Sequence, residues 1–240
     1  MPHAPRARQT THEVTNQPDP VARDLWAGDT GLRRWSGGGD TATLATFGAA
    51  AGSAAMRDAG RDANRHPPDL VLFDRGGRRL DEVAFQPAYH ALMDLGLSAG
   101  YAACGWDGTP GGHVTHAALV YMLSQIEPGV CCPMTMTYAA VPALAPDPVL
   151  SAVWRPKLTA RGYDPASVPL AMKRAATMGM AMTEKQGGSD VRANTTTAQA
   201  ATGAMTRRCA PTWRAGQAPR PRRRRAGMPS GWRCCWPGRC

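Results

Sequence analysis

One stretch constrains this chain more than any other: residues 177–190, where an apolar alternation ends in a polar, glycine-rich bend. Met178, Met180 and Met182 alternate with smaller residues, and this period of two predicts a strand with one apolar face. The sequence Thr-Glu-Lys-Gln-Gly-Gly-Ser-Asp follows directly. Glycines let the backbone approach a ligand closely, and hydroxyls can bond to a polar heterocycle or a phosphate. The stretch therefore predicts a strand that opens into a ligand-holding loop.

This stretch resembles the flavin loop of the acyl-CoA dehydrogenases, most of all the alkylation-response branch of that family. The residues that carry the resemblance are 179–191 (GMAMTEKQGGSDV), with Asn-Thr-Thr at 194–196. Three more segments agree, in the order that the family has them: TNQP at 15–18, RRLD at 78–81 and CPMTMT at 132–137. A Gly-Gly-Ser bend alone would be a weak signal, so the resemblance rests on the whole set.

The resemblance implies a mainly α fold, with the N-terminal helical domain of the acyl-CoA dehydrogenases and then the first strand or strands of their middle β domain. We place an extended arm at 1–20, the helical domain at 21–170, and the start of the β domain, with the flavin loop, at 171–200. Residues 201–240 are expected to form a disordered basic tail. We expect no counterpart of the family's C-terminal helical bundle.

FAD is the cofactor that the resemblance implies, with flavin contacts from Met182, Thr183, Gly188 and Ser189. The resemblance also places Thr135 and Thr137 on an apolar helix that backs the substrate cavity in relatives. A threonine on such a helix more often bonds to the carbonyl four residues back, and that alternative stays open.

Glu184 and Asp190 have the chemistry of an acid/base pair. The family, however, removes the substrate α-proton with a carboxylate of its C-terminal domain while the β-hydride passes to the flavin. We therefore assign no catalytic residue in this chain. Glu184 is expected to hold the loop through backbone N–H groups, and Asp190 is expected to cap or turn the chain.

Prolines, glycines and capping residues divide the remaining sequence into short elements. Helices are expected over 21–35, 43–65, 87–99, 114–126, 134–144 and 149–160, with a loop or small hairpin over 69–85. Asp40 or Thr41 is the expected N-cap of the second helix, and Pro87 is expected in the first turn of the third.

The net charge of +10 lies entirely in the tail, which holds ten arginines after residue 200 and no acidic residue. The tail also lacks Leu, Ile, Val, Phe and Tyr, so it cannot bury enough apolar surface to offset its ordering entropy. GC-rich DNA that is translated out of frame yields a chain rich in Arg, Pro, Gly, Ala, Trp and Cys, which is the composition of this tail. We therefore hypothesise a frameshift near Ala200. The alternative is a nucleic-acid-binding arm in which Arg222, Arg223, Arg224 and Arg225 grip phosphates and tryptophans stack on bases.

The seven cysteines include no C-x-x-C pair, so neither a zinc site nor a disulfide framework is indicated. His113 and His116 share a helix face, but no third ligand is apparent, so we expect no metal site. No apolar run is long enough for a membrane helix, and no secretory signal is visible. We expect a cytoplasmic protein whose intact relatives form homo-oligomers.

The resemblance implies an FAD-dependent acyl-CoA dehydrogenase-like protein. The intact relative would oxidise a short branched acyl-CoA at Cα–Cβ, protect DNA in the alkylation response, or both. We expect this chain to be truncated and to have little or no such activity, because FAD is held by groups from at least two domains in the family. The competing prediction is a helical module whose arginine-rich tail binds nucleic acid without sequence specificity.

Overall fold

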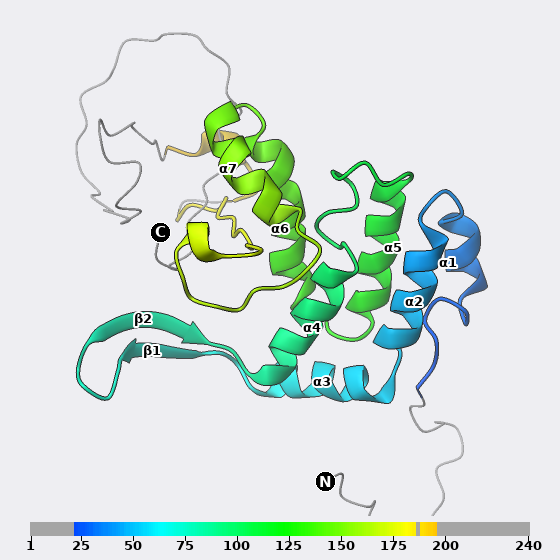
Figure 1. The fold of residues 1–240 in the computed structure, drawn as a ribbon, viewed down its shortest axis with the longest axis horizontal. Coiled ribbons are helices and arrows are strands. Elements are labelled where there is room, and N and C mark those ends of the chain that lie inside the picture. Colours follow the sequence, from blue (N-terminus) through cyan, green and yellow to red (C-terminus); the bar gives the residue numbers. More distant parts are fainter. Residues whose placement is uncertain (1–21, 186–187, 196–240) are drawn as a thin grey trace, which may run out of the picture.

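The computed structural model describes residues 22–185 and 188–195 of the 240-residue chain. It is a set of packed α-helices from which a two-stranded hairpin extends (Figure 1). The helices are α1 (Thr30–Trp35), α2 (Thr41–Ala51), α3 (Ala54–Arg65), α4 (Pro87–Ser98), α5 (Gly112–Ser124), α6 (Cys131–Leu144) and α7 (Pro148–Leu158). The strands are β1 (Asp69–Phe73) and β2 (Arg79–Ala84), and short 3-10 turns cover Leu170–Met172 and Val191–Ala193. The mainly α fold expected from the sequence is confirmed.

The prediction of a single helix over 43–65 is wrong, because the structure has two helices there, α2 and α3. They part at Gly52, where a Cβ would lie 1.7 Å from the carbonyl oxygen of Arg23. The N–H of Arg23 donates to the Gly52 carbonyl oxygen at 3.1 Å, so a segment distant in sequence crosses the chain here. Ser53 then caps α3 by accepting from the N–H of Met56 at 3.3 Å. Local sequence could not show this crossing.

The helix expected over 21–35 is also shorter than predicted, because α1 holds its last six residues. The carboxylate of Asp24 accepts from the backbone N–H groups two and three residues on, both at 2.8 Å, which stabilises a turn instead of a helix. Asp29 then caps α1 by accepting from the N–H of Leu32 at 2.7 Å. The turn at Asp24 and the cap at Asp29 therefore place the start of α1 at Thr30, later than the sequence predicted.

The other four helices begin and end close to the predicted positions. Pro87 lies in the first turn of α4, where its missing N–H costs nothing. Asp147 caps α7 by accepting from two backbone N–H groups, both at 3.0 Å. The predicted cap Asp40 accepts from the N–H of Thr43 at 3.1 Å and starts α2. Asp40 and Pro87 were recognised from the sequence as helix-start signals, whereas the local caps Asp29 and Ser53 were not.

The predicted hairpin is present as an antiparallel pair, with Leu70 opposite Val83 and an irregular register after Val71. Its apolar side chains are unusually open: Leu70, Leu72 and Phe73 are all exposed. The hairpin extends away from the helices (Figure 1), which is why neither of its faces is fully covered.

Two apolar clusters hold the helices together. The larger one joins α2, α4, α5 and α6, and Leu92, Leu119, Met122 and Met134 are completely buried in it. The smaller one joins α6 to α7 and to the chain that follows: Ala140, Val141, Leu158 and Met178. Met178 is thus the residue by which the 177–190 stretch enters the core.

The strand expected over Met178–Met182 is not formed, because these residues are extended chain outside any ladder in the structure. A strand needs a hydrogen-bonded neighbour, and the N–H of Met178 bonds to a helix side chain instead. The expected single apolar face is also absent, since Met178 is buried whereas Met182 is 41% exposed.

Several predictions concern residues that lie outside the described ranges. They are the arm at 1–20, the tail at 201–240 with Arg222, Arg223, Arg224 and Arg225, and the first glycine of the Gly187-Gly188 pair. Across the described part of the chain, no helix is both long and apolar enough to cross a membrane.

Candidate cofactor site

The predicted flavin contacts lie on one short segment, residues 182–189. Thr183 and Gly188 touch: a Cβ on Gly188 would lie 2.7 Å from the Thr183 hydroxyl oxygen and 3.0 Å from its methyl group. Ser189 follows directly, and the side chains of Met182, Thr183 and Ser189 are all exposed. The structure therefore brings Thr183 beside Gly188, with two hydroxyls and a thioether open to the surface.

Side chains further along the same segment close it into a loop. One carboxylate oxygen of Glu184 accepts from the N–H of Thr195 at 2.9 Å and from its hydroxyl at 3.3 Å. The Asn194 amide donates to the Met182 carbonyl oxygen at 2.8 Å. Asp190 caps the last 3-10 turn by accepting from the N–H two residues on, at 3.1 Å. Glu184 and Asp190 thus have the loop-holding and capping contacts predicted for them.

The two threonines of α6 differ in what they contact. Thr137 is completely buried, and its hydroxyl donates to the Pro133 carbonyl oxygen at 2.7 Å, as the general rule for helical threonines predicts. The same oxygen accepts from the N–H of Met178 at 3.0 Å, a contact that the sequence did not reveal. Thr135 is exposed, and its hydroxyl lies 3.0 Å from the Tyr101 hydroxyl.

The chain between α7 and Met178 is fixed by lysine side chains. The ammonium group of Lys173 donates to the carbonyl oxygens of Asp164 and Ala166, at 2.9 and 2.7 Å. The ammonium group of Lys157, on α7, donates to the Lys173 carbonyl oxygen, and the Lys157 carbonyl oxygen accepts from the N–H of Ala176 at 3.0 Å. These contacts hold the connecting segment against α7 and lead the chain to α6.

Comparison with known proteins adds to this geometry. Residues 16–165 match the family described as the adaptive response protein AidB N-terminal domain, which is more than half of the chain. The chain belongs to the AidB family. The match ends at residue 165, before the loop at 182–189. It therefore supports the assignment of the helical part to the family and says nothing about the loop.

Two curated proteins are similar to this AidB-family chain. The putative acyl-CoA dehydrogenase AidB of Escherichia coli (strain K12) is 41% identical over 199 residues, which cover 79% of this chain and 36% of the relative. The acyl-CoA dehydrogenase family member 11 of Caenorhabditis elegans is 31% identical over 141 residues, which cover 55% of this chain and 21% of the relative. The chain thus matches about a third or less of the length of these relatives.

Two solved structures have the same fold. The Bd2924 apo-form aligns with a TM-score of 0.60 and 26% identity, over 74% of this chain and 36% of that protein. The Caenorhabditis elegans ACDH-11 structure in complex with C11-CoA aligns with a TM-score of 0.57 and 24% identity, over 78% of this chain and 34% of that protein. At this identity the second likeness supports the fold alone.

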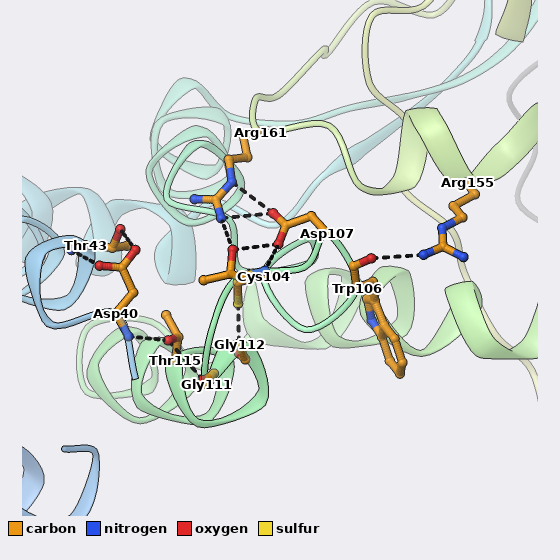
Figure 2. Close-up of polar contacts among 11 residues, drawn as sticks. Asp40, Thr43, Cys104, Trp106, Asp107, Gly111, Gly112, Thr115, Arg155 and Arg161 are labelled. Carbon is orange, nitrogen blue, oxygen red and sulfur yellow. Dashed lines mark hydrogen bonds and ion pairs between the residues drawn. The ribbon is translucent and has the colours of Figure 1, made fainter. Parts of the chain in front are cut away.

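A second polar network fixes the loop before α5 in this AidB-family fold (Figure 2). The guanidinium of Arg161 donates twice to one carboxylate oxygen of Asp107, at 2.9 and 3.1 Å, and once to the Thr109 hydroxyl at 2.9 Å. Arg155 on α7 donates to the Trp106 carbonyl oxygen at 2.9 Å. The sequence analysis missed this network, although Asp-Gly-Thr at 107–109 is a recognisable turn signal.

The Asp107 contacts predict a pH dependence. Partial burial would raise the pKa of Asp107, but hydrogen bonds from Thr109 and Arg161 outweigh it and hold the pKa below 3.8. The carboxylate therefore stabilises the fold fully above pH 3.8, and this contribution is lost as the pH falls through the lower pKa of the folded state. We expect Asp107→Asn to lower stability by about 1 kcal/mol at pH 5, after solvent screening is allowed for.

The measurement is urea unfolding of the wild type and of Asp107→Asn at pH 5 and pH 3. The difference between their free energies of unfolding should narrow at pH 3, because pH 3 lies below 3.8 and the carboxyl group of the unfolded wild type then takes up a proton, which favours the unfolded state. An equal difference at the two pH values would contradict the role given to the Asp107 charge.

The two histidines predicted to share a face of α5 do so, and they pack on aromatic rings. The Tyr138 hydroxyl bonds to Nδ1 of His113, and the His116 ring stacks on the Tyr138 ring with centroids 3.7 Å apart. Nδ1 of His116 also bonds to the Tyr101 carbonyl oxygen at 2.7 Å. Within the described ranges, no group of three or more His, Cys, Asp and Glu side chains could hold a metal ion.

Two of the three described cysteines, Cys104 and Cys131, are buried and behave as packing residues, whereas Cys132 is exposed. Burial raises the pKa of the Cys104 thiol to about 11, so the thiol is protonated at neutral pH. Its sulfur donates to the Gly112 carbonyl oxygen at 3.2 Å (Figure 2). Cys131 is buried at the start of α6.

Proposed function

We propose that the protein contributes a flavin contact of an AidB-type, acyl-CoA dehydrogenase-like flavoprotein, through Met182, Thr183, Gly188 and Ser189. The observation that carries this proposal is the touching pair of Thr183 and Gly188 beside the exposed Ser189. The names of the two curated relatives, a putative acyl-CoA dehydrogenase and an acyl-CoA dehydrogenase family member, point to the same class. Flavin binding by this chain is the proposal, because the chain matches only 36% and 21% of the length of those relatives.

The residues fit the edge of an isoalloxazine ring. In the described ranges, the hydroxyls of Thr183 and Ser189 form no hydrogen bond within the protein, so both can bond to a ligand's nitrogens and carbonyl oxygens. A side chain at position 188 would collide with Thr183, so glycine lets residues 183 and 188 lie in contact. Bound FAD would supply the hydride acceptor for oxidation at Cα–Cβ of an acyl-CoA.

Acyl-CoA is the substrate class that we propose, with a short branched acyl chain as the finer expectation. Of the two threonines predicted on the substrate side, Thr135 is exposed, whereas the Thr137 hydroxyl is occupied by two protein contacts. Of these two threonines, only Thr135 is therefore proposed to contact the substrate directly. The structure of ACDH-11, a protein of the same fold, was solved with C11-CoA.

The proposal is tested by titrating FAD with the purified 240-residue chain and following flavin fluorescence. We expect weak, saturable quenching by the wild type. Replacing Thr183 and Ser189 together with alanine should weaken affinity about tenfold, since each lost hydrogen bond is worth about 1 kcal/mol. Thr46→Ala, which removes an exposed hydroxyl on α2, is the control and should bind FAD as the wild type does. Absence of quenching by the wild type, or equal affinity of the double variant, would contradict the proposal.

A further inference from the structure

The hydroxyl of Thr137 joins the helical body to the segment that leads into the loop. It is completely buried, it donates to the Pro133 carbonyl oxygen within α6, and it accepts from the N–H of Met178. Thr137 and Met178 are 41 residues apart in sequence, so this hydrogen bond connects two distant parts of the chain.

The two bonds of this hydroxyl are not equally replaceable. Pro133 lies four residues before Thr137 in α6, so its carbonyl oxygen already accepts from the helix backbone. The N–H of Met178 lies outside any helix or strand, and it is buried with a side chain that is 6% exposed. A buried N–H without a partner is costly, so the acceptor role of the hydroxyl has the greater consequence.

The side chain of Met178 is held at the same place. It packs in the smaller apolar cluster with Ala140 and Val141 of α6 and Leu158 of α7. Thr183 follows five residues later in extended chain. The position of the backbone at Met178 therefore limits where Thr183 and its neighbours can lie relative to α6.

We propose that Thr137 is a positioning residue for the candidate cofactor site, and that its hydroxyl fixes the 178–183 segment on α6. The relation to flavin rests on the proposed function, whereas the anchoring of Met178 does not. Thr137 thus acts through the backbone of Met178 and has no contact of its own with a ligand.

The test compares amide hydrogen exchange at Met178 in the wild type, Thr137→Val and Thr137→Ser. Valine has nearly the shape of threonine but no hydroxyl, so we expect exchange at Met178 to become at least about tenfold faster. Serine keeps the hydroxyl and should restore slow exchange. Thr46→Val is the matched control: it removes an exposed threonine hydroxyl on α2 that also donates to the carbonyl oxygen four residues back, and it should leave exchange at Met178 unchanged.

Wild-type-like exchange at Met178 in Thr137→Val, or fast exchange in the wild type itself, would overturn the anchoring. The second result needs no variant and decides the matter even if Thr137→Val does not fold.

FAD titration separates the two proposals. If the wild type does not quench flavin, the proposed function fails and the exchange result still decides the anchoring. If the wild type binds FAD, Thr137→Val should bind about fivefold more weakly, and unchanged affinity would overturn the positioning role.

Discussion

Replacing Gly112 with alanine is expected to lower the free energy of unfolding by about 3 kcal/mol or more, and the melting temperature by roughly 6–12 °C. Gly112 is buried at the start of α5, and a Cβ there would lie 1.8 Å from the Cys104 carbonyl oxygen and 2.6 Å from the carbonyl carbon. Both atoms belong to the backbone, so no change of rotamer can relieve the overlap. The loop before α5 and the helix would have to separate, and the Cys104–Gly112 hydrogen bond would be lost.

The measurement is thermal and urea unfolding followed by circular dichroism. Gly38→Ala is the matched control, because Gly38 lies beside the same junction and a Cβ there would meet nothing within 4 Å. Its free energy of unfolding should stay within about 0.5 kcal/mol of the wild type. Similar stability of the Gly112 and Gly38 variants would show that the packing of α5 on the preceding loop is not as tight as the structure has it.

Much of the helical fold could be predicted because its signals are local. Pro87, Asp40 and Asp147 mark helix starts through contacts that lie within a few residues. The hairpin over 69–85 was visible from two apolar runs around Arg-Gly-Gly-Arg. The bond from Thr137 to the carbonyl four residues back followed from a general rule for helical threonines.

Most of the errors come from contact between residues distant in sequence, whereas the late start of α1 comes from the local turn at Asp24. The break at Gly52 depends on the crossing of the Arg23 backbone, and the Asp107–Arg161 pair joins two loops 54 residues apart. At Met178 the apolar alternation predicted a strand, but the N–H there bonds to Thr137 and no neighbouring strand pairs with it in the described residues. At the candidate site, residue types were recognisable from the sequence, whereas the contact of Thr183 with Gly188 was not.

Truncating Met134 to alanine should cost about 2–5 kcal/mol of stability, because it leaves a cavity at the centre of the larger apolar cluster. Met134 is completely buried on α6 and faces Gly96 on α4. Met172→Ala is the control: Met172 is 71% exposed, so its loss should change stability by no more than about 0.5 kcal/mol. Urea unfolding of both variants measures the difference, and equal stabilities would contradict the burial of Met134.

Gly96 offers a sharper test of the same contact. A Cβ at Gly96 would lie 2.6 Å from the Met134 sulfur and 3.0 Å from its terminal methyl carbon. In the wild type, Gly96→Ala must therefore displace the end of the methionine, which offsets the gain of about 1 kcal/mol in helix propensity. With Met134 already cut to alanine, the added methyl fills part of the cavity and its nearest remaining neighbour is a Leu123 side-chain carbon, at 3.3 Å, so most of the gain remains. We expect the two substitutions to couple by about 1 kcal/mol or more, so that Gly96→Ala stabilises the Met134→Ala variant. Strictly additive effects would mean that α4 and α6 do not approach each other through this pair.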